Sequence, residues 1–564
     1  MRLPCPCWKR SAGNEAAQRA FTGAVADGGR GGSGPAGCLE PPSRVKSVLQ
    51  KTLRAALGLT PHLREHARFR RDPVGTQQAL LRRLLRTASA TEWGRRYDFA
   101  AIAEAPDVTR AFRERVPLHT YDDLREDARR IRGGAEDVIW PGRMTHFAVS
   151  SGTASDGKVI PLSQQSLAAT RRFSIGAGLH YLAETGDPSF LFGKHLTLPG
   201  RIAEDDDFPG THVGEVSGLV AEQAPSYFRT LLQAVPNEVA FMPGWNRKLE
   251  EIARRTARMD VRLVVMAPTW ALVLFEELMA EYERQTGRPA DTVADVWPNL
   301  QVFISGGVTL SSYRALLEQT IGRPRGQSVD FLETYGASEG FFSFQSDQDD
   351  PSMLLHLGSE VFYEFVPLDQ LDTGAPERLT IGEVETGVRY ALVVSNASGL
   401  WAYRVGDVVR FTSLFPHKIE VAGRTSEMVD GYGEAVFGEE ARTAMQAACR
   451  EAGARMTDFH LAPHPDADAE EGLPSHQWLV EFEDGADPDR ERFARVLDEH
   501  LQEVNRHYRI RREAEAFGAP TVEVLPSGTF YRWLQHEKER VTGQTKVPRM
   551  SEERDVADSV MRVA

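Results

Sequence analysis

Two short stretches of sequence, VFISGG at residues 302–307 and ETYGASEG at residues 333–340, decide the fold class. In each, a β-rich run passes directly into glycine and other small residues. Such runs alternate with amphipathic helical stretches between about residues 145 and 415, which is typical of layered α/β proteins. Strands that end in small residues leave a flat slot at the carboxyl edge of an open sheet, where nucleotides commonly bind. The sequence therefore predicts an α/β fold with Gly306, Gly307, Tyr335 and Gly336 at a nucleotide-binding edge.

A second motif, SSGTASDGK at residues 150–158, lies between two expected strands. Gly152 to Lys158 fits the spacing of a P-loop, but Val159 stands where that motif requires Ser or Thr, and Pro161 disfavours a helix starting there. We therefore exclude a P-loop ATPase. Glycine backbone and hydroxyl groups still suit phosphate, so the segment is either a phosphate-binding turn or an ordinary polar hairpin.

Three further side chains are candidates for binding a nucleotide, and for two of them an ordinary structural role is the alternative. Tyr335 can stack on a base, and Glu339 can bind Mg²⁺ on a polyphosphate, or it can be a solvated glutamate in a glycine turn. Asp407 lies in an apolar β-run, YRVGDVV, where an unpaired carboxylate is costly to bury. Its partner is either a ribose diol or a neighbouring arginine, Arg404 or Arg410.

Composition narrows the possible partners and locations. The 564 residues carry 66 basic and 80 acidic side chains, a net charge of −14, which disfavours nucleic acid and anionic membrane as main partners. Four cysteines do not make a disulfide scaffold, and no apolar run approaches a membrane span. The first residues also lack the apolar centre of a signal peptide. We expect a cytoplasmic protein, and if it binds phosphate, it must do so with a local group of residues rather than with its overall charge.

The chain divides into three expected parts. Residues 1–42 are predicted to be a disordered leader because their Gly-rich composition cannot bury a core. Residues 43–423 form the expected large α/β domain, and residues 424–564 a smaller α+β domain that is mobile. The glycines that follow Arg424 are plausible hinge material between the two domains.

Together these motifs resemble the adenylate-forming ligase superfamily and, within it, the acyl acid amido synthetases of the auxin-responsive promoter (Gretchen Hagen) family. The matching elements stand in family order over about residues 50–550: SSGT at 150–153 with Gly157-Lys158, YGASE at 335–339, YRVGD at 403–407 and KVPR at 546–549. One departure is the loop at residues 423–429, which is closer to the hinge of acyl-CoA synthetases. The terminal KVPR is instead similar to amido synthetases.

The resemblance implies an AMP-forming ligase that uses ATP and Mg²⁺. A carboxylic acid becomes an acyl-adenylate, and an amine, expected to be an amino acid, then takes the acyl group. The implied roles are as follows: Ser150, Ser151, Gly152, Thr153 and Lys158 hold phosphates, Tyr335 stacks on adenine, Ser338 lies near the α-phosphate, Glu339 holds Mg²⁺, Asp407 holds the ribose, Arg424 reaches ribose or phosphate, and Lys546 bridges the α-phosphate and the substrate carboxylate.

The acyl pocket is expected between the phosphate loop and the middle helices, with Phe173, Met266, Trp270 and Phe303 as lining candidates, although such residues are also typical of a core. Arg171 or Arg172 can recognise an acidic group. Two rival functions stay open: an acyl-CoA ligase or carrier-protein acylating adenylase with the same first step, and a non-catalytic acyl-acid-binding protein. The acid, the amine and the oligomeric state are left undetermined.

Overall fold

A computed structural model describes residues 69–564 of the chain, except residues 150–157, 206, 243, 308–309, 311–312, 372, 374, 426–427, 430–433, 435, 465–472, 484–485, 487, 514–515, 538–546 and 552. The predicted leader, residues 1–42, lies outside the described residues. Among the described helices, none is long and apolar enough to cross a membrane.

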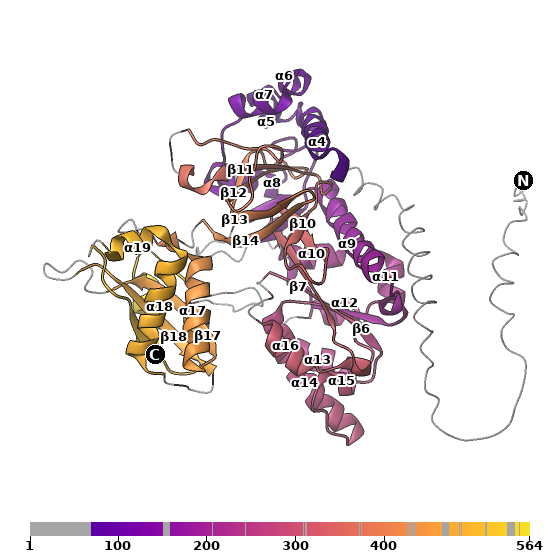
Figure 1. Cartoon of the computed structure of the whole chain (residues 1–564). Helices are drawn as coiled ribbons and strands as arrows, with labels where there is room; N and C mark the ends of the chain where they lie inside the picture. The colour runs from indigo at the N-terminus through magenta and orange to yellow at the C-terminus, as the bar shows by residue number, and fades with distance from the viewer. Residues whose placement is uncertain are drawn as a thin grey trace, which may run out of the picture. The chain divides into compact units, whose positions relative to one another are not determined.

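Capped helices open the described chain (Figure 1): α4 (Pro73–Ala88), α5 (Glu92–Arg96), α6 (Phe99–Glu104), α7 (Val108–Arg115) and α8 (Tyr121–Arg132). An aspartate or threonine precedes each of the first four helices, and its side-chain oxygen accepts a first-turn N–H that has no partner inside the helix. At α8, Thr120 and Asp123 form a capping box, which sets the residue at which that helix begins.

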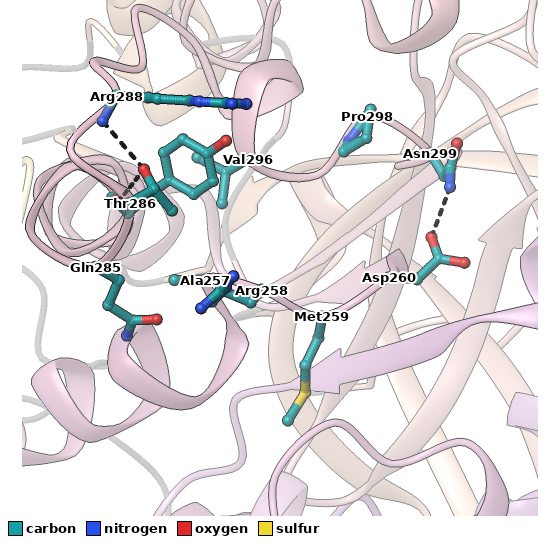
Figure 2. Close-up of a pocket in the computed structure, with 11 residues that line it drawn as sticks. Ala257, Arg258, Met259, Asp260, Gln285, Thr286, Arg288, Val296, Pro298 and Asn299 are labelled. Carbon is teal, nitrogen blue, oxygen red and sulfur yellow. Dashed lines mark hydrogen bonds between the residues drawn. The ribbon is translucent and has the colours of Figure 1, made fainter. Parts of the chain in front are cut away.

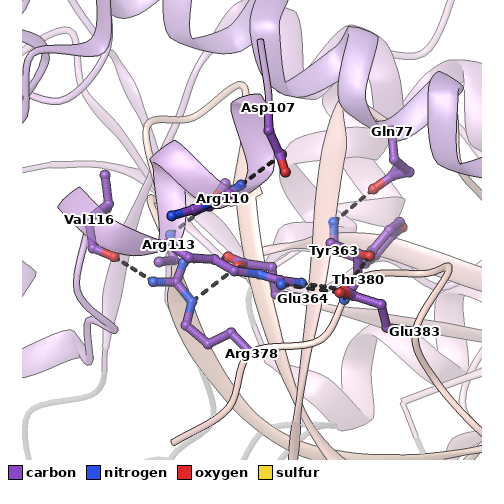
Figure 3. Close-up of polar contacts among 12 residues, drawn as sticks. Gln77, Asp107, Arg110, Arg113, Val116, Tyr363, Glu364, Arg378, Thr380 and Glu383 are labelled. Atoms are coloured by element: carbon purple, nitrogen blue, oxygen red, sulfur yellow. Dashed lines mark hydrogen bonds and ion pairs between the residues drawn. The ribbon is translucent and has the colours of Figure 1, made fainter. Parts of the chain in front are cut away.

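A buried ion network fastens these helices to the main sheet (Figure 3). Glu364 is fully buried on strand β11 (Val361–Pro367) and accepts two hydrogen bonds from the Arg378 guanidinium, at 3.0 and 2.7 Å. Arg378 also donates to the carbonyl oxygen of Val116, which follows α7. Arg113 of α7 pairs with Glu383 at 2.6 Å. Both charges of the Glu364–Arg378 pair are therefore satisfied by several polar partners, as a buried pair requires.

The main sheet has ten strands in the order β11-β12-β13-β14-β10-β9-β8-β7-β6-β3. Neighbours among β3, β6, β7 and β8 run parallel, and the remaining neighbours run antiparallel. Their bounds are β3 (Lys194–Thr197), β6 (Val261–Val265), β7 (Val302–Gly306), β8 (Asp330–Ala337), β9 (Gly340–Gln345), β10 (Met353–Leu355), β11 (Val361–Pro367), β12 (Arg389–Asn396), β13 (Tyr403–Leu414) and β14 (His417–Arg424).

A second sheet of four strands, in the order β2-β1-β5-β4, carries the phosphate-loop motif between its first two strands. Its bounds are β1 (His146–Val149), β2 (Val159–Leu162), β4 (Ile202–Glu204) and β5 (His212–Gly214). The helices of this region are α9 (Gln164–Thr185), α10 (Val216–Glu222), α11 (Ser226–Leu231), α12 (Asn237–Ala240), α13 (Trp245–Thr256), α14 (Pro268–Thr286), α15 (Val293–Val296) and α16 (Arg314–Ile321).

The parallel strands are covered on both faces, as alternating side chains on β7 show. Phe303 packs into a core with Phe275 of α14 and Phe331 of β8, while its neighbour Val302 belongs to a separate cluster with Tyr181 of α9. Successive side chains on a strand point to opposite faces, so helices lie on both sides of the sheet. The predicted α/β layering is confirmed.

The C-terminal part is α+β, also as predicted, with a three-stranded sheet in the order β17-β18-β19. Its bounds are β15 (Met428–Val429), β16 (Val436–Phe437), α17 (Gly438–Ala452), β17 (Met456–Pro463), β18 (His476–Phe482), α18 (Arg490–Val504), α19 (Arg506–Glu513), β19 (Thr521–Leu525), α20 (Thr529–Glu537) and α21 (Asp555–Val563). Phe459, Trp478 and Leu497 are central to its own core, which is why this part forms a separate cluster. The division of the chain at residues 423–424 stays a prediction.

Candidate active site

The VFISGG and ETYGASEG motifs, at residues 302–307 and 333–340, lie side by side at one edge of the main sheet. β7 and β8 pair in parallel with Ser305 opposite Glu333 and Gly306 opposite Thr334. The Thr334 hydroxyl donates to the Ser305 carbonyl at 2.9 Å, and a Cβ on Gly306 would lie 3.0 Å from that hydroxyl oxygen. Gly307 has a φ of +85°, which favours glycine. The glycines therefore permit the close approach that the sequence predicted at the carboxyl edge.

Tyr335 and Asp407 are joined by a buried hydrogen bond. The Tyr335 hydroxyl donates to Oδ2 of Asp407 at 2.7 Å, although the two residues lie 72 positions apart in the chain. Arg424, opposite Asp407 in the β13–β14 pairing, places its Nε 3.4 Å from Oδ1. Burial and the Asp407 charge raise the pKa of Tyr335 well above its usual range, so the phenol stays a donor. Of the two arginines considered as partners, Arg410 instead bonds Glu420 at 2.8 Å.

Glu339 lies in the turn between β8 and β9 and is only 4% exposed. Burial raises the pKa of its carboxyl to about 7, and the nearby Asp407 carboxylate adds to the rise. Lys158 and Arg424 oppose it. Glu339 and Asp407 are buried carboxylates whose negative charges repel each other, so a bound cation would stabilise the ionised form of both. Mg²⁺ commonly takes one or two protein carboxylates together with substrate phosphates, so this donor set fits the ion that the sequence predicts.

Tyr403 adds a polar atom that the sequence analysis did not assign. Its side chain is 1% exposed, and its hydroxyl oxygen is buried with no hydrogen-bond partner among the described residues. Burial raises the pKa of this phenol, and the closeness of Glu339 and Tyr121 raises it further. The hydroxyl therefore stays protonated beside Glu339. The one sequence signal for it was the YRVGD motif, in which it stands four residues before Asp407.

The predicted phosphate loop is described only at its two ends. Ser150, Ser151, Gly152 and Thr153 lie outside the described residues. Val149 pairs with Val159 across the antiparallel β1–β2 hairpin that closes the loop, so Lys158 leads into a strand. A P-loop would open a helix there, and the exclusion of a P-loop ATPase is confirmed.

Lys546 also lies outside the described residues, but the chain that follows it is well placed. Val547 is buried, and the Nδ1 atom of His460 lies 2.6 Å from the carbonyl oxygen of Pro548. The Leu461 N–H donates to the carbonyl oxygen of Arg549 at 2.8 Å. Strand β17 therefore holds the residues next to Lys546 along its own edge.

The four candidates for the acyl pocket fall into different places. Phe173 packs against Phe341, Phe344 and His356, with ring centroids 5.5 Å apart in each pair. Met266 and Phe303 belong instead to the core beneath α13 and α14, and Trp270 on α14 is half-buried. The structure does not gather the four into one cluster, and their pocket role stays a prediction.

The two arginines considered for an acidic substrate already have partners. Arg172 donates to Glu360 at 3.1 Å, and Arg171 donates to the carbonyl oxygen of Gln223 at 3.3 Å. Recognition of an acidic group by Arg171 or Arg172 stays a prediction.

A cavity of about 550 Å³ is lined by other residues than these (Figure 2). It is lined by Asp260, which directly precedes β6, and by Thr286, Arg288 and Asn299. This is the amino edge of the parallel strands, opposite the edge that carries Gly306. The position of the cavity disqualifies it as the nucleotide site that the strand ends predict.

Comparison with known proteins covers most of the chain. The model of the GH3 family N-terminal domain matches residues 62–198 and 180–325, the central-domain model residues 354–424, and the C-terminal-domain model residues 439–555. An indole-3-acetic acid-amido synthetase of Arabidopsis thaliana is 23% identical over 556 residues, which is 85% of this chain and 89% of the relative. A jasmonoyl–L-amino acid synthetase of Nicotiana attenuata is 22% identical over 83% of this chain and 89% of its own length.

Solved structures agree on the fold. The acyl acid amido synthetase GH3.15 superposes with a TM-score of 0.70 at 18% identity, covering 87% of this chain and 93% of that one. A 2-hydroxyisobutyryl-CoA ligase superposes with a TM-score of 0.53 at 13% identity, over 86% and 90% of the two chains. The likeness extends over the large α/β region and the C-terminal α+β region together.

Proposed function

This chain belongs to the GH3 family, and on that premise we propose that it is an ATP-dependent acyl acid amido synthetase. In the first half-reaction a carboxylate oxygen of the acid attacks the α-phosphorus of ATP, and pyrophosphate leaves. In the second, an amine nitrogen attacks the acyl carbon, AMP leaves, and the nitrogen loses a proton. The observation that carries the proposal is the buried cluster of Glu339, Asp407 and Tyr335 beside the Gly306–Gly307 edge.

The nucleotide would lie along this edge. Asp407, oriented by Tyr335 and Arg424, is the acceptor we assign to the ribose hydroxyls. Arg424, with its side chain 54% exposed, is able to reach a ribose or phosphate oxygen from the same place. Stacking of adenine on Tyr335 and a place for the α-phosphate near Ser338 remain parts of the proposal.

Glu339 is the residue we assign to Mg²⁺, with Asp407 close enough to add negative charge. When bound, Mg²⁺ neutralises phosphate charge that builds during transfer to the carboxylate. Lys158 supplies a positive charge on the loop side of the same site. Such preplaced charges stabilise a developing oxyanion more effectively than water does, because they need no reorganisation.

Lys546 is the lysine we assign to the α-phosphate and the substrate carboxylate. A lysine suits this role because its charge sits on a long, flexible stem. The hydrogen bonds between β17 and residues 548–549 fix the main chain shortly after Lys546 within the C-terminal part. Positioning the lysine by movement of the whole C-terminal part is consistent with the expected hinge after Arg424.

An amino acid is the acceptor that the relatives favour. The curated relatives named above are amido synthetases at 22–23% identity over more than four fifths of this chain, whereas the CoA ligase shares 13%. A cytoplasmic location stays a prediction from the sequence.

The test is pyrophosphate exchange into ATP, screened over carboxylic acids, followed by mass spectrometry of products formed with mixed amino acids. We expect exchange with at least one acid and an amide whose mass equals acid plus amino acid minus water. If pyrophosphate exchange occurs but the only product is a CoA thioester, the acceptor is CoA rather than an amine. An absence of exchange with every acid, in protein that still binds an acid, would favour the non-catalytic binding protein.

A further inference from the structure

A short segment, residues 119–121, joins the strand that carries Asp407 to the exit of the phosphate loop. The His119 N–H donates to the carbonyl oxygen of Ala402 at 2.9 Å, and the Arg404 N–H donates to the carbonyl oxygen of His119 at 2.8 Å. His119 thus forms a parallel bridge with Tyr403, the first residue of β13. The segment is held to β13 by main-chain bonds on both sides of that residue.

The His119 side chain fixes the same segment from inside the protein. Its Nδ1 lies 2.7 Å from the carbonyl oxygen of Trp401, which can only accept, so Nδ1 carries the proton. Its Nε2 then accepts from the Tyr97 hydroxyl at 2.9 Å. Burial lowers the pKa of His119, which keeps this neutral tautomer near pH 7. The two hydrogen bonds of the imidazole therefore hold His119, and with it the residues that follow, in one position.

Tyr121 reaches from this segment to the second sheet. It is the first residue of α8, and the Thr120–Asp123 capping box sets where the helix starts. The Tyr121 hydroxyl oxygen accepts the N–H of Val159 at 2.9 Å. Among the described strands, β2 lies at the edge of its sheet and pairs only with β1, so no strand on its other side offers an acceptor to this N–H. Val159 directly follows Lys158, which makes the Tyr121 hydroxyl the first fixed point after the loop.

We propose that Tyr121 is a positioning residue for the first half-reaction, because its hydrogen bond to Val159 sets the main chain from which Lys158 reaches the Glu339–Asp407 site. The inference rests on the proposed function, since it gives Lys158 a role in binding ATP phosphates. Lys158 lies close enough to Glu339 for its charge to act on that carboxyl. Tyr121 also lies close enough to Tyr403 to raise the pKa of that phenol.

The first experiment compares Tyr121→Phe with wild type by ATP affinity, measured by calorimetry, and by pyrophosphate-exchange kinetics. Losing one hydrogen bond of ordinary strength corresponds to a loss of about two- to tenfold in equilibrium terms. We expect the Kd and KM for ATP to rise by about that factor while kcat changes less than twofold. Tyr531→Phe, which alters an exposed tyrosine on α20, is the matched control and should change neither.

The second experiment separates positioning from a general loss of structure. In a Lys158→Ala background, Tyr121→Phe should add no further loss of ATP affinity, because its effect passes through Lys158. Equal losses in both backgrounds, or unchanged ATP affinity in Tyr121→Phe, would overturn the inference while leaving the proposed function intact. Wild-type protein that binds no ATP would instead overturn the proposed function, and the inference with it.

Discussion

Replacing Tyr335 by Phe removes the hydroxyl that bonds Asp407 and little else. The Tyr335 hydroxyl lies 2.7 Å from the Asp407 carboxylate, whereas the Nε atom of Arg424 lies 3.4 Å from it. Asp407 is only 7% exposed. Removing a hydrogen bond to a buried charged group costs about 1.5–3 kcal/mol. We expect Tyr335→Phe to lower the free energy of unfolding by that amount.

Tyr363→Phe is the matched control because Tyr363 is fully buried and its hydroxyl donates to a neutral acceptor, the carbonyl oxygen of His356, at 3.1 Å. A bond of this kind contributes about 0.5–1.5 kcal/mol. The two variants remove the same atom from the same residue type, so the difference between them isolates the charge of Asp407. Urea unfolding followed by tryptophan fluorescence measures both losses.

ATP affinity supplies the second readout. If Asp407 accepts the ribose hydroxyls, a freed carboxylate that swings out of place should weaken ATP binding in Tyr335→Phe by about tenfold, which corresponds to ~1.4 kcal/mol. Tyr363→Phe should bind ATP as wild type does. Equal stability losses in the two variants would refute the argument from charge, and unchanged ATP affinity in Tyr335→Phe would refute the orienting role of its hydroxyl.

Three other predictions concern separate parts of the molecule. Arg378→Met should lower the free energy of unfolding by about 3–5 kcal/mol, because it leaves Glu364 buried without its main partner. Arg110→Met, which breaks an exposed i,i+4 pair, should leave stability close to that of the wild type, and similar losses for the two variants in urea titrations would contradict this reasoning. Burial lowers the pKa of Lys248 from 10.5 to about 8, so the unfolded chain binds more protons between these values and stability should rise with pH there by up to about 3 kcal/mol. Lys248→Met should flatten that rise, and an unfolding curve with the same pH slope in the variant would contradict the assignment. Lys546→Ala should lose pyrophosphate exchange while its thermal melting stays as in wild type, and exchange at the wild-type rate would remove the lysine from the first half-reaction.

Local patterns were sufficient to predict the class of fold, and they indicated which residues form the candidate site. The change from β-rich runs to glycine at Gly306 predicted a strand end, because such a run favours an extended chain and a small residue permits close approach. The replacement of the P-loop hydroxyl by Val159 excluded one ATP-binding fold, because a β-branched apolar side chain supplies no ligand for Mg²⁺. Each conclusion depends on residues that are close together in the chain.

The pairing of the site residues depended on contacts between distant segments. Sequence reasoning predicted that Asp407 needs a partner, and the partners it considered were a ribose diol and the nearest arginines in the chain. The structure assigns it Tyr335 and Arg424, which adjacent strands bring to it. Likewise, no local signal marks Tyr121, because its function follows from a hydrogen bond to Val159, 38 residues away.

The sequence by itself determined that this chain is a layered α/β protein with an α+β C-terminal part, that it carries the motifs of an adenylate-forming enzyme, and that an acidic protein must hold phosphate with local groups. These properties follow from composition, periodicity and motif order. Only the tertiary structure decided which buried carboxylates approach each other at Glu339 and Asp407, which hydroxyls orient them, and which candidate pocket residues are core. Those outcomes depend on strand register and on the burial of charge, and both are set by packing between segments that the chain keeps far apart.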